Sequence, residues 1–397
     1  MKKKLLALAL ALTMALGLTA CGGGNDTSAA DDGGSDTTES TGTAFKIGVI
    51  GPLTGGAAIY GTCVANSAQI AVDEINALGG DIQFELLPAA DDVNDAETSV
   101  NAYNSLMDKG MQILVGTVTT QPALSVVPLT YDDRVFTLTP SASGDDVIEN
   151  NDNVFQICFT DSNQGSRSAQ YINEHFPDAK IGIIYKNDEQ YSIGIRDNFK
   201  AEADARGMDI VYEGTFAEAN QTDFNVQLTA AQSAGADLLF LPIYYTPASA
   251  ILTQANALGY KPTFFGVDGM DGILTADNFD ASLAEGVYLL TPFSADAEDE
   301  MTQNFVTKYQ EAYGETPNQF GADAYDAIYT LYQAIQAAGV TADMATEDIC
   351  DALIEVMPTI SVTGLTSAGS EMTWDANGAV SKDPTAVIIE NGTYVTP

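Results

Sequence analysis

FKIGVIGPLTGGAAIYG, residues 45–61, combines a short apolar run, a loop rich in glycine and the start of a helical pattern. The run at 45–50 is almost continuously apolar, as is typical of a strand covered on both faces of a sheet. Apolar residues at helical spacing follow to residue 78, and Gly79-Gly80 predicts the end of that helix. A strand, a loop and a helix in this order predict one unit of a parallel α/β sheet.

The same alternation continues along the chain. Strands are expected at 84–87, 113–115, 135–138, 180–185, 209–212, 238–241 and 264–267, and helices at 95–109, 195–206, 223–234, 248–258 and 318–338. Two series of this kind predict an α/β protein with two Rossmann-like lobes and parallel central sheets. The ~350 residues of the folded part also exceed what one common core holds.

Composition excludes several classes of function. The chain has 397 residues and a formal net charge of −40, so it should repel nucleic acid and anionic lipid. His175 is the only histidine, which excludes a histidine-based metal cluster, and we expect no metal and no cofactor. Beyond residue 21, Cys63, Cys158 and Cys350 are far apart, and we expect small buried side chains. A single disulfide between two of them stays open.

The N-terminal residues predict export and anchoring. Lys2-Lys3-Lys4 precede an apolar run at 5–18, and Leu18-Thr19-Ala20-Cys21 follows. A positive start, a short apolar core and small residues before a cut predict a signal peptide at 1–20. The last four residues resemble a bacterial lipobox, which implies lipid attachment to Cys21 outside the cytoplasm; an ordinary signal peptide with an incidental cysteine is the alternative. Residues 21–43 are nearly all small or polar and predict a disordered tether.

The first lobe places hydroxyl groups where its strands end. In parallel α/β sheets, ligands bind beyond the carboxyl ends of the strands, where loops lead into helices. The loop after 113–115 contains Thr119 and Thr120, and the loop after 135–138 contains Ser141, Ala142 and Ser143. Hydroxyls and free backbone N–H groups at helix starts can bind a carboxylate without a formal positive charge. Simple N-capping is the alternative for each loop.

The second lobe places an acid and aromatic residues at the equivalent ends. Asp188-Glu189-Gln190-Tyr191, Tyr244-Tyr245 and Asp268-Gly269 each follow an expected strand. A zwitterion needs neutral donors for its carboxylate and an acid for its ammonium group, and aromatic rings can cover an aliphatic side chain or a cation. Asp268 is equally explained as a turn residue.

These loops, together with the lipobox and the length, give the chain a family resemblance. It resembles the leucine/isoleucine/valine-binding protein family, the type I periplasmic-type binding proteins of ABC importers. The resemblance covers about 45–395 and is carried by residues 45–61, AVDEINALGG at 71–80, Asp91-Asp92, QTDFNVQLTAAQSAGAD at 221–237 and GVDG at 266–269.

The resemblance implies the organisation of the folded part. It implies two lobes joined by three crossing segments, near Phe159, Leu290 and Pro384. Lobe 1 would comprise 44–160 plus 293–383, and lobe 2 would comprise 161–292 plus 384–397. The cleft between them would close on the ligand by hinge rotation.

The resemblance also implies roles for single residues. Thr120 and Ser143 would hold the ligand carboxylate with the backbone of Ala142, and Asp268 would take the α-ammonium group. Tyr60, Tyr191, Tyr244 and Phe293 would line or close the pocket. Departures from the family pattern, such as Tyr191-Ser192 for the usual Tyr-Gly, leave the precise ligand open.

The predicted function is therefore binding and transport, not catalysis. The chain has no GxSxG elbow, Walker A loop, HExxH motif or GxGxxG on its first strand-to-helix turn. We expect a lipid-anchored, monomeric receptor that binds an aliphatic or branched amino acid and delivers it to a membrane permease and its ATPase. An amide, urea or another small solute is the alternative ligand. A sensor that contacts a signalling receptor is the alternative role.

Overall fold

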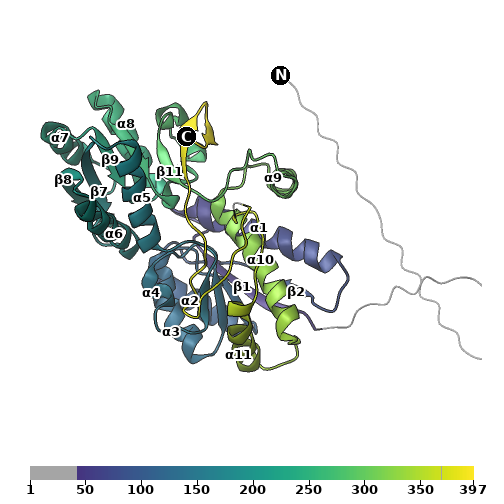
Figure 1. Cartoon of the computed structure of the whole chain (residues 1–397). Helices are drawn as coiled ribbons and strands as arrows, with labels where there is room; N and C mark the ends of the chain where they lie inside the picture. The colour runs from purple at the N-terminus through teal and green to yellow at the C-terminus, as the bar shows by residue number, and fades with distance from the viewer. Residues whose placement is uncertain (1–42, 368) are drawn as a thin grey trace, which may run out of the picture. The chain divides into compact units, whose positions relative to one another are not determined.

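The computed structural model describes residues 43–367 and 369–397. The predicted signal peptide, Cys21 and nearly all of the predicted tether lie outside the described residues. Two sheets organise the described part, and helices follow most of their strands (Figure 1).

The first sheet is parallel throughout. Its strand order is β2-β1-β4-β5-β6, with β3 paired to the end of β1. Its strands are β1 (Phe45–Gly51), β2 (Phe84–Leu86), β3 (Ala90–Asp91), β4 (Ile113–Gly116), β5 (Phe136–Thr139) and β6 (Val154–Gln156). Every residue of β4 and β5 is buried, as expected for strands covered on both faces.

The second sheet has a parallel centre and an antiparallel edge. Its order is β13-β12-β11-β10-β9-β7-β8, and β12 runs antiparallel to both β11 and β13. Its strands are β7 (Lys180–Lys186), β8 (Asp209–Phe216), β9 (Leu238–Leu241), β10 (Thr263–Gly266), β11 (Tyr288–Leu290), β12 (Ala386–Glu390) and β13 (Thr393–Val395). The predicted fold class, two α/β lobes around mainly parallel sheets, is confirmed.

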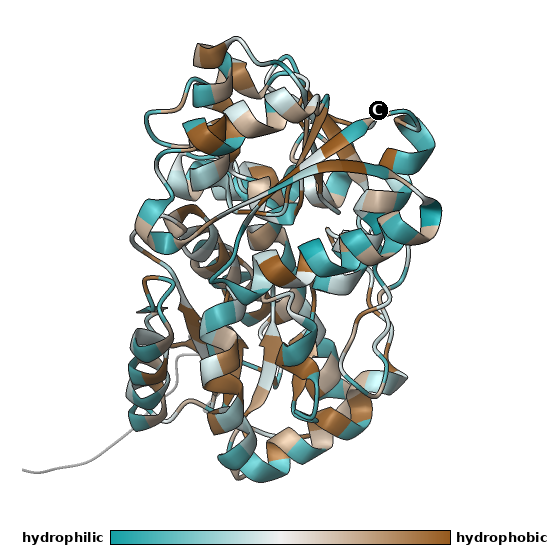
Figure 2. Cartoon of the chain, turned by 90° about the vertical axis from the view of Figure 1, so that its left-hand side faces the viewer, coloured by the Kyte–Doolittle hydropathy of each residue, from teal (hydrophilic) through white to brown (hydrophobic). Residues whose placement is uncertain are grey.

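The helices pack around these sheets. In the first half of the chain they are α1 (Ala58–Ala77), α2 (Ala96–Asp108), α3 (Thr120–Asp132), α4 (Asp145–Ile148) and α5 (Asp161–His175). In the second half they are α6 (Gln190–Arg206), α7 (Asn225–Ala234), α8 (Tyr245–Leu258), α9 (Glu300–Tyr313), α10 (Gln319–Ala338) and α11 (Thr346–Val356). Short 3-10 turns follow at η1 (Glu218–Asn220), η2 (Asp268–Met270), η3 (Ile273–Thr275), η4 (Ala281–Ala284) and η5 (Met357–Thr359). The strands are largely hydrophobic, and the helices show hydrophilic residues on their outer sides (Figure 2).

Gly61 explains how the opening stretch folds. It lies in the first turn of α1, where a Cβ atom would come within 2.1 Å of the carbonyl oxygen of Pro52. Only glycine allows the helix to approach the loop this closely. The contact fixes the path from β1 into α1 and so the position of Tyr60.

The helices that carry predicted site residues begin earlier than the sequence indicates. Helix α6 begins at Gln190 and α8 at Tyr245, whereas the apolar pattern predicted starts at residues 195 and 248. The first turns of both helices contain polar or aromatic residues that do not follow the apolar periodicity. Tyr191 therefore lies within the first turn of α6, and Tyr244 is the N-cap residue of α8.

The three segments that pass between the sheets contact one another. The backbone N–H of Thr291, after β11, donates to the carbonyl of Thr385, before β12, at 2.9 Å. The indole N–H of Trp374 donates to the carbonyl of Gln156, before the first crossing, at 2.7 Å. Lys382, just before β12, contacts Asp323 of α10 at 2.6 Å, and both side chains are 3% exposed. A buried ion pair thus anchors the third crossing to the first lobe.

We expect Lys382→Ala to destabilise the protein by about 3–5 kcal/mol, because Asp323 would remain as a buried charge without its partner. The double variant Asp323→Asn/Lys382→Met should recover most of this loss. Urea unfolding measures the free energy of unfolding of both variants. Lys308→Ala is the matched control, since the Lys308–Glu74 pair leaves the lysine 52% exposed and should contribute ~1 kcal/mol or less. Equal losses for Lys382→Ala and Lys308→Ala would contradict the anchoring role.

Candidate functional site

Asp268 is a buried acid at the end of a strand of the second sheet. It follows β10 at the start of η2 and is 2% exposed. One carboxylate oxygen accepts hydrogen bonds from the Tyr191 hydroxyl at 2.5 Å and from the backbone N–H of Gly269 at 2.7 Å. None of the ion pairs found among residues 43–367 and 369–397 involves Asp268.

Burial raises the pKa of Asp268 to about 7, although the hydrogen bonds from Tyr191 and Gly269 oppose this shift. Loss of hydration disfavours the charged form more than these donors favour it. A ligand cation at this carboxylate would remove much of the penalty. A role as a turn residue explains why Asp268 accepts a hydrogen bond from the backbone N–H of Gly269. It does not explain why the carboxylate is buried.

Three predicted tyrosines surround this acid. The rings of Tyr191 and Tyr244 stack at 4.7 Å between centroids, and Tyr60 meets Tyr244 edge-on at 5.5 Å. The Tyr60 hydroxyl donates to the carbonyl of Gly269 and accepts the backbone N–H of Tyr245 at 3.2 Å. Helix α1, which follows strand β1 of the first sheet, therefore contacts two loops of the second sheet directly through Tyr60.

Gly269 makes this arrangement possible. A Cβ atom at this position would come within 2.5 Å of the Tyr191 hydroxyl oxygen and 2.7 Å of the Tyr244 ring. Any larger residue would push the stacked tyrosines away from Asp268. The glycine after the acid is thus required by close packing.

The two hydroxyl loops of the first sheet form one continuous surface. The Ser141 hydroxyl donates to the carbonyl of Val118 at 2.7 Å, and Thr120 Oγ1 accepts the backbone N–H of Gly144 at 3.2 Å. Ala142, also buried, donates its own N–H to Thr139 Oγ1 at 2.9 Å. These hydroxyls hold the loops to each other.

Three other hydroxyls in these loops are buried and unused. Thr117, Thr119 and Ser143 are 2%, 3% and 1% exposed, and within the described residues their hydroxyl oxygens have no hydrogen-bond partner. Thr119 is the N-cap residue of α3, yet its side chain makes no capping hydrogen bond. N-capping therefore does not explain Thr119, and a polar ligand group would satisfy such free hydroxyls.

Asp161 connects the hydroxyl surface to Asp268. Its backbone N–H donates to the carbonyl of Ser143 at 2.8 Å. Burial raises the pKa of Asp161 well above its usual value, and the nearby charge of Asp268 adds to the shift. The first turn of α5 thus contacts the hydroxyl loops and lies near Asp268.

Phe293 lies in a different cluster. It packs against Phe305 at 6.1 Å between ring centroids, in an apolar group that includes Cys63 and Tyr309. Phe320, at the start of α10, contacts the Tyr60 ring at 4.5 Å instead. The role of Phe293 in ligand binding stays a prediction. Phe320 was not predictable from the sequence, because it follows a helix cap and no strand.

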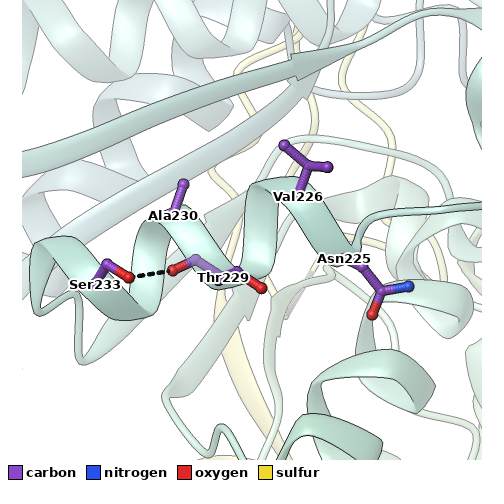
Figure 3. Close-up of a pocket in the computed structure, with 5 residues that line it drawn as sticks. All are labelled: Asn225, Val226, Thr229, Ala230 and Ser233. Carbon is purple, nitrogen blue, oxygen red and sulfur yellow. Dashed lines mark hydrogen bonds between the residues drawn. The ribbon is translucent and has the colours of Figure 1, made fainter.

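Two surface hollows differ in chemistry. One is a shallow hollow on α7, lined by Asn225, Val226, Thr229, Ala230 and Ser233 (Figure 3). It contains none of the predicted site residues. The other, about 310 Å3, is lined by Val93, Asn94, Asp95, Gln121, Lys186, Asp188, Glu189 and Glu218. It lies where loops of both sheets meet, and Gln121, Asp188 and Glu189 belong to loops that were predicted from the sequence to carry chemistry.

Cysteine and metal chemistry are limited in the described part of the chain. Cys63, Cys158 and Cys350 are free and buried, and burial raises the pKa of Cys63 to about 11. Among residues 43–367 and 369–397, no group of three or more His, Cys, Asp or Glu side chains could hold a metal ion. In the same part of the chain, no helix has the length and apolar character needed to cross a membrane.

Two α/β lobes, three crossings and a polar site at the strand ends define the class of solute-binding proteins. Residues 44–383 match the family described as periplasmic binding protein, and the chain belongs to this family.

Curated relatives and solved structures support this assignment. The Leu/Ile/Val-binding protein BraC3 of Rhizobium johnstonii is 31% identical over 303 residues, which cover 75% of this chain and 81% of that protein. The isoleucine complex of LivJ from Streptococcus pneumoniae is 27% identical with a TM-score of 0.78, covering 89% of this chain and all of that one. A leucine binding protein of Thermotoga maritima is 26% identical with a TM-score of 0.77, covering 89% of this chain and 98% of that one.

The buried acids predict an unusual pH dependence of stability. Burial raises the pKa of Asp92, Glu189 and Asp268 to about 7, whereas unfolded acids titrate near pH ~4. The native state therefore binds more protons than the unfolded state between these values, and stability falls as pH rises through this window. Without ligand, the melting temperature should increase from pH 8 to about pH 5.5.

Asp92→Asn is the control, because it removes one of these acids. The increase in melting temperature from pH 8 to about pH 5.5 should be smaller in this variant. Hydrogen bonds from Thr98 lower the pKa of Asp95. Acids of this kind make the protein less stable as pH falls, but only near and below their usual pKa, which lies outside this pH window. Calorimetry from pH 8 to about pH 5.5 measures the melting temperatures of both proteins. A melting temperature that falls steadily from pH 8 to about pH 5.5 would show that the buried acids do not dominate.

Proposed function

We propose that this protein is the solute-binding component of an ABC importer and that it binds an aliphatic or branched α-amino acid between its lobes. The observation that carries the proposal is the buried Asp268 carboxylate, which has tyrosines around it and no cation paired with it in the described part of the chain. An α-ammonium group would supply the missing charge. Relatives named for leucine, isoleucine and valine support this ligand class.

The unused hydroxyls support the other half of the ligand. In the proposed complex, Thr119, Thr120 and Ser143 donate to the α-carboxylate with the backbone at Ala142, while Ser141 keeps the two loops together. Tyr60, Tyr191 and Tyr244 cover the aliphatic side chain, and Phe293 stays a proposed pocket residue. The arrangement pairs neutral donors with the anion and a carboxylate with the cation.

Binding is proposed to close the cleft by hinge rotation. Lobe 1 is assigned 44–160 plus 293–383, and lobe 2 is assigned 161–292 plus 384–397. The presence of β11, β12 and β13 in the second sheet supports this division. Closure would add the contacts of lobe 2, above all Asp268, to a ligand already held by lobe 1, and the affinity follows from these added contacts.

The pKa of Asp268 near 7 also supports a second candidate. A protonated Asp268 is neutral and can donate a hydrogen bond, which suits an amide or urea that carries no cation. A ligand screen separates the two candidates. It should include the branched amino acids, their des-amino acids and the corresponding amides.

We expect full-length protein to be stabilised by leucine, isoleucine or valine, and Asp268→Asn to lose this stabilisation. At 100 times its dissociation constant a ligand adds ~2.7 kcal/mol, which thermal unfolding detects. 4-Methylpentanoate, which lacks the ammonium group of leucine, should bind at least about tenfold more weakly because Asp268 would stay unpaired. Stabilisation by amides alone, with no response to any amino acid, would reverse the ranking of the two candidates.

The proposed location is outside the cytoplasm, with the chain anchored to the membrane by lipid on Cys21. The signal sequence and the polar residues that follow Cys21 support this location. A monomeric receptor on such a tether would deliver ligand to a permease and ATPase complex. Fold does not distinguish this role from sensing.

Cys21→Ser should release the protein from the membrane into the soluble fraction, because the acyl chains supply most of the attachment. Fractionation of bacterial cells followed by immunoblotting measures the change. Cys63→Ser is the control and should leave the protein in the membrane fraction. Membrane attachment that survives Cys21→Ser would show that the lipobox assignment is wrong.

A further inference from the structure

The first turn of α10 contacts the turn that carries Asp268. We infer that Gln319, the first residue of α10, is a positioning residue that holds this turn where the Asp268 carboxylate meets the α-ammonium group of the ligand. The inference rests on the proposed function, since it gives a cause for the preference for an ammonium group. It predicts that one amide of the first lobe sets how strongly the site selects amino acids over their des-amino acids.

Helix α10 packs with the first sheet, although it lies far along the chain (Figure 1). It contacts α1, β4 and β5, and the Phe320 ring lies 4.5 Å from the Tyr60 ring between centroids. The N-cap residue Asn318 accepts the backbone N–H of Gly321 through its side chain at 3.2 Å. Gln319, which is 1% exposed, is therefore fixed at the start of a long and capped helix.

The Gln319 side chain donates to two carbonyls of the second sheet and its loops. Its Nε2 atom lies 3.2 Å from the carbonyl oxygen of Asp268 and 3.4 Å from that of Leu290, the last residue of β11. An amide group carries two N–H donors, so it serves both carbonyls at once. Leu290 lies at the predicted second crossing. Gln319 thus connects the Asp268 turn to the segment on which the lobes are proposed to rotate.

A second acid of the same turn holds the helix in return. Asp271 is buried, and its carboxylate accepts the backbone N–H of Gln319 at 2.9 Å and that of Gly272 at 2.7 Å. The N–H groups of a first helical turn have no partner within the helix, and the positive end of the helix dipole favours a carboxylate there. Asp271 is thereby bound to α10, which leaves Asp268 of this turn for the proposed ligand.

Few other contacts reach this turn from the first lobe. Within the described residues, the backbone of 268–270 accepts hydrogen bonds from elements of the first sheet only through Tyr60, at Gly269, and through Gln319, at Asp268. Tyr60 also packs against Tyr244, so changing it would disturb the rings proposed to cover the ligand. The Gln319 side chain bonds to backbone carbonyls instead. A substitution there uncouples the first lobe from Asp268 and leaves the tyrosines in place.

Matched ligands and matched variants test this role. Leucine and 4-methylpentanoate share the carboxylate and the branched side chain, and only leucine carries the ammonium group. Calorimetric titration of full-length protein, solubilised in mild detergent, compares the wild type, Gln319→Met and Gln112→Met, with the weaker ligand measured by competition. Gln112 is the control because its Nε2 donates to the carbonyl of Ala342 at 2.9 Å, beside the start of β4 and at the opposite end of that strand from the hydroxyl loops.

We expect Gln319→Met to weaken leucine binding by about fivefold or more, on the scale of one lost hydrogen bond, and to change 4-methylpentanoate binding by less than about twofold. The preference for leucine falls because a displaced Asp268 meets the ammonium group less well. Gln112→Met should leave this preference unchanged, although it also loses a side-chain hydrogen bond.

Melting temperatures without ligand show which variants are folded. Gln319→Asn gives the same comparison if Gln319→Met does not fold. Its side chain is shorter by one methylene group, and the hydrogen bonds of Gln319 are already 3.2 and 3.4 Å long, so the amide would no longer reach both carbonyls.

Two results would overturn the inference alone. Equal losses for both ligands in Gln319→Met would show that the residue acts on folding or on closure and not through Asp268. An unchanged preference for leucine in a folded variant would show that the turn keeps its place without this amide. Wild-type protein that binds no amino acid, or binds leucine no better than 4-methylpentanoate, overturns the proposed function and the inference together.

Discussion

The Asp268 carboxylate is buried without a paired cation from the described part of the chain, and the proposed site depends on this constraint. Moving a carboxylate out of water costs several kcal/mol after relaxation, and two hydrogen-bond donors on one oxygen offset only part of this cost. The fold keeps the acid buried nevertheless, because Gly269 allows the tyrosines to pack against it. From the other lobe, the Tyr60 hydroxyl donates to the carbonyl of Gly269. The fold therefore keeps a buried carboxylate that none of the ion pairs among the described residues includes, and in the proposed complex affinity comes from removing this penalty.

The rest of the architecture keeps that acid opposite its counterpart. Parallel strands in each sheet direct their carboxyl ends, and the loops that follow them, to one edge. The hydroxyl loops of the first sheet are fixed to each other by Ser141 and Thr120, which leaves Thr119 and Ser143 free. The buried Lys382–Asp323 pair and the contact between Thr291 and Thr385 hold the crossings together. In the proposed complex, these fixed loops on two lobes would recognise both halves of a zwitterion, with neutral donors for its carboxylate and Asp268 for its ammonium group.

The alternation of apolar strands and helices was enough to predict the fold class, because buried parallel strands leave a clear apolar signal. Glycines predicted as helix ends, such as Gly207, indeed adopt the left-handed conformation there. The antiparallel edge formed by β12 and β13 was not predictable, since strand pairing across the chain leaves no local pattern. In the site, the sequence indicated which loops carry chemistry but not which hydroxyls remain free. Ser141 and Ser143 look equivalent in the sequence, and only packing separates them. Phe320 became recognisable only when the first turn of α10 was placed.

The raised pKa values of Asp92, Asp268 and Glu189 have a common origin, because burial is the largest influence on all three acids. Among the described residues, Glu189 forms an ion pair with Lys186 at 3.7 Å, whereas Asp92 and Asp268 take part in none of the ion pairs. Asp268 differs from Asp92 in the tyrosines around it, since Tyr191 donates to its carboxylate and Tyr244 stacks on Tyr191. In the proposed complex, a ligand ammonium group removes the penalty at Asp268 alone. Ligand binding and stability near neutral pH are then linked through this one acid, because the bound cation favours its charged form.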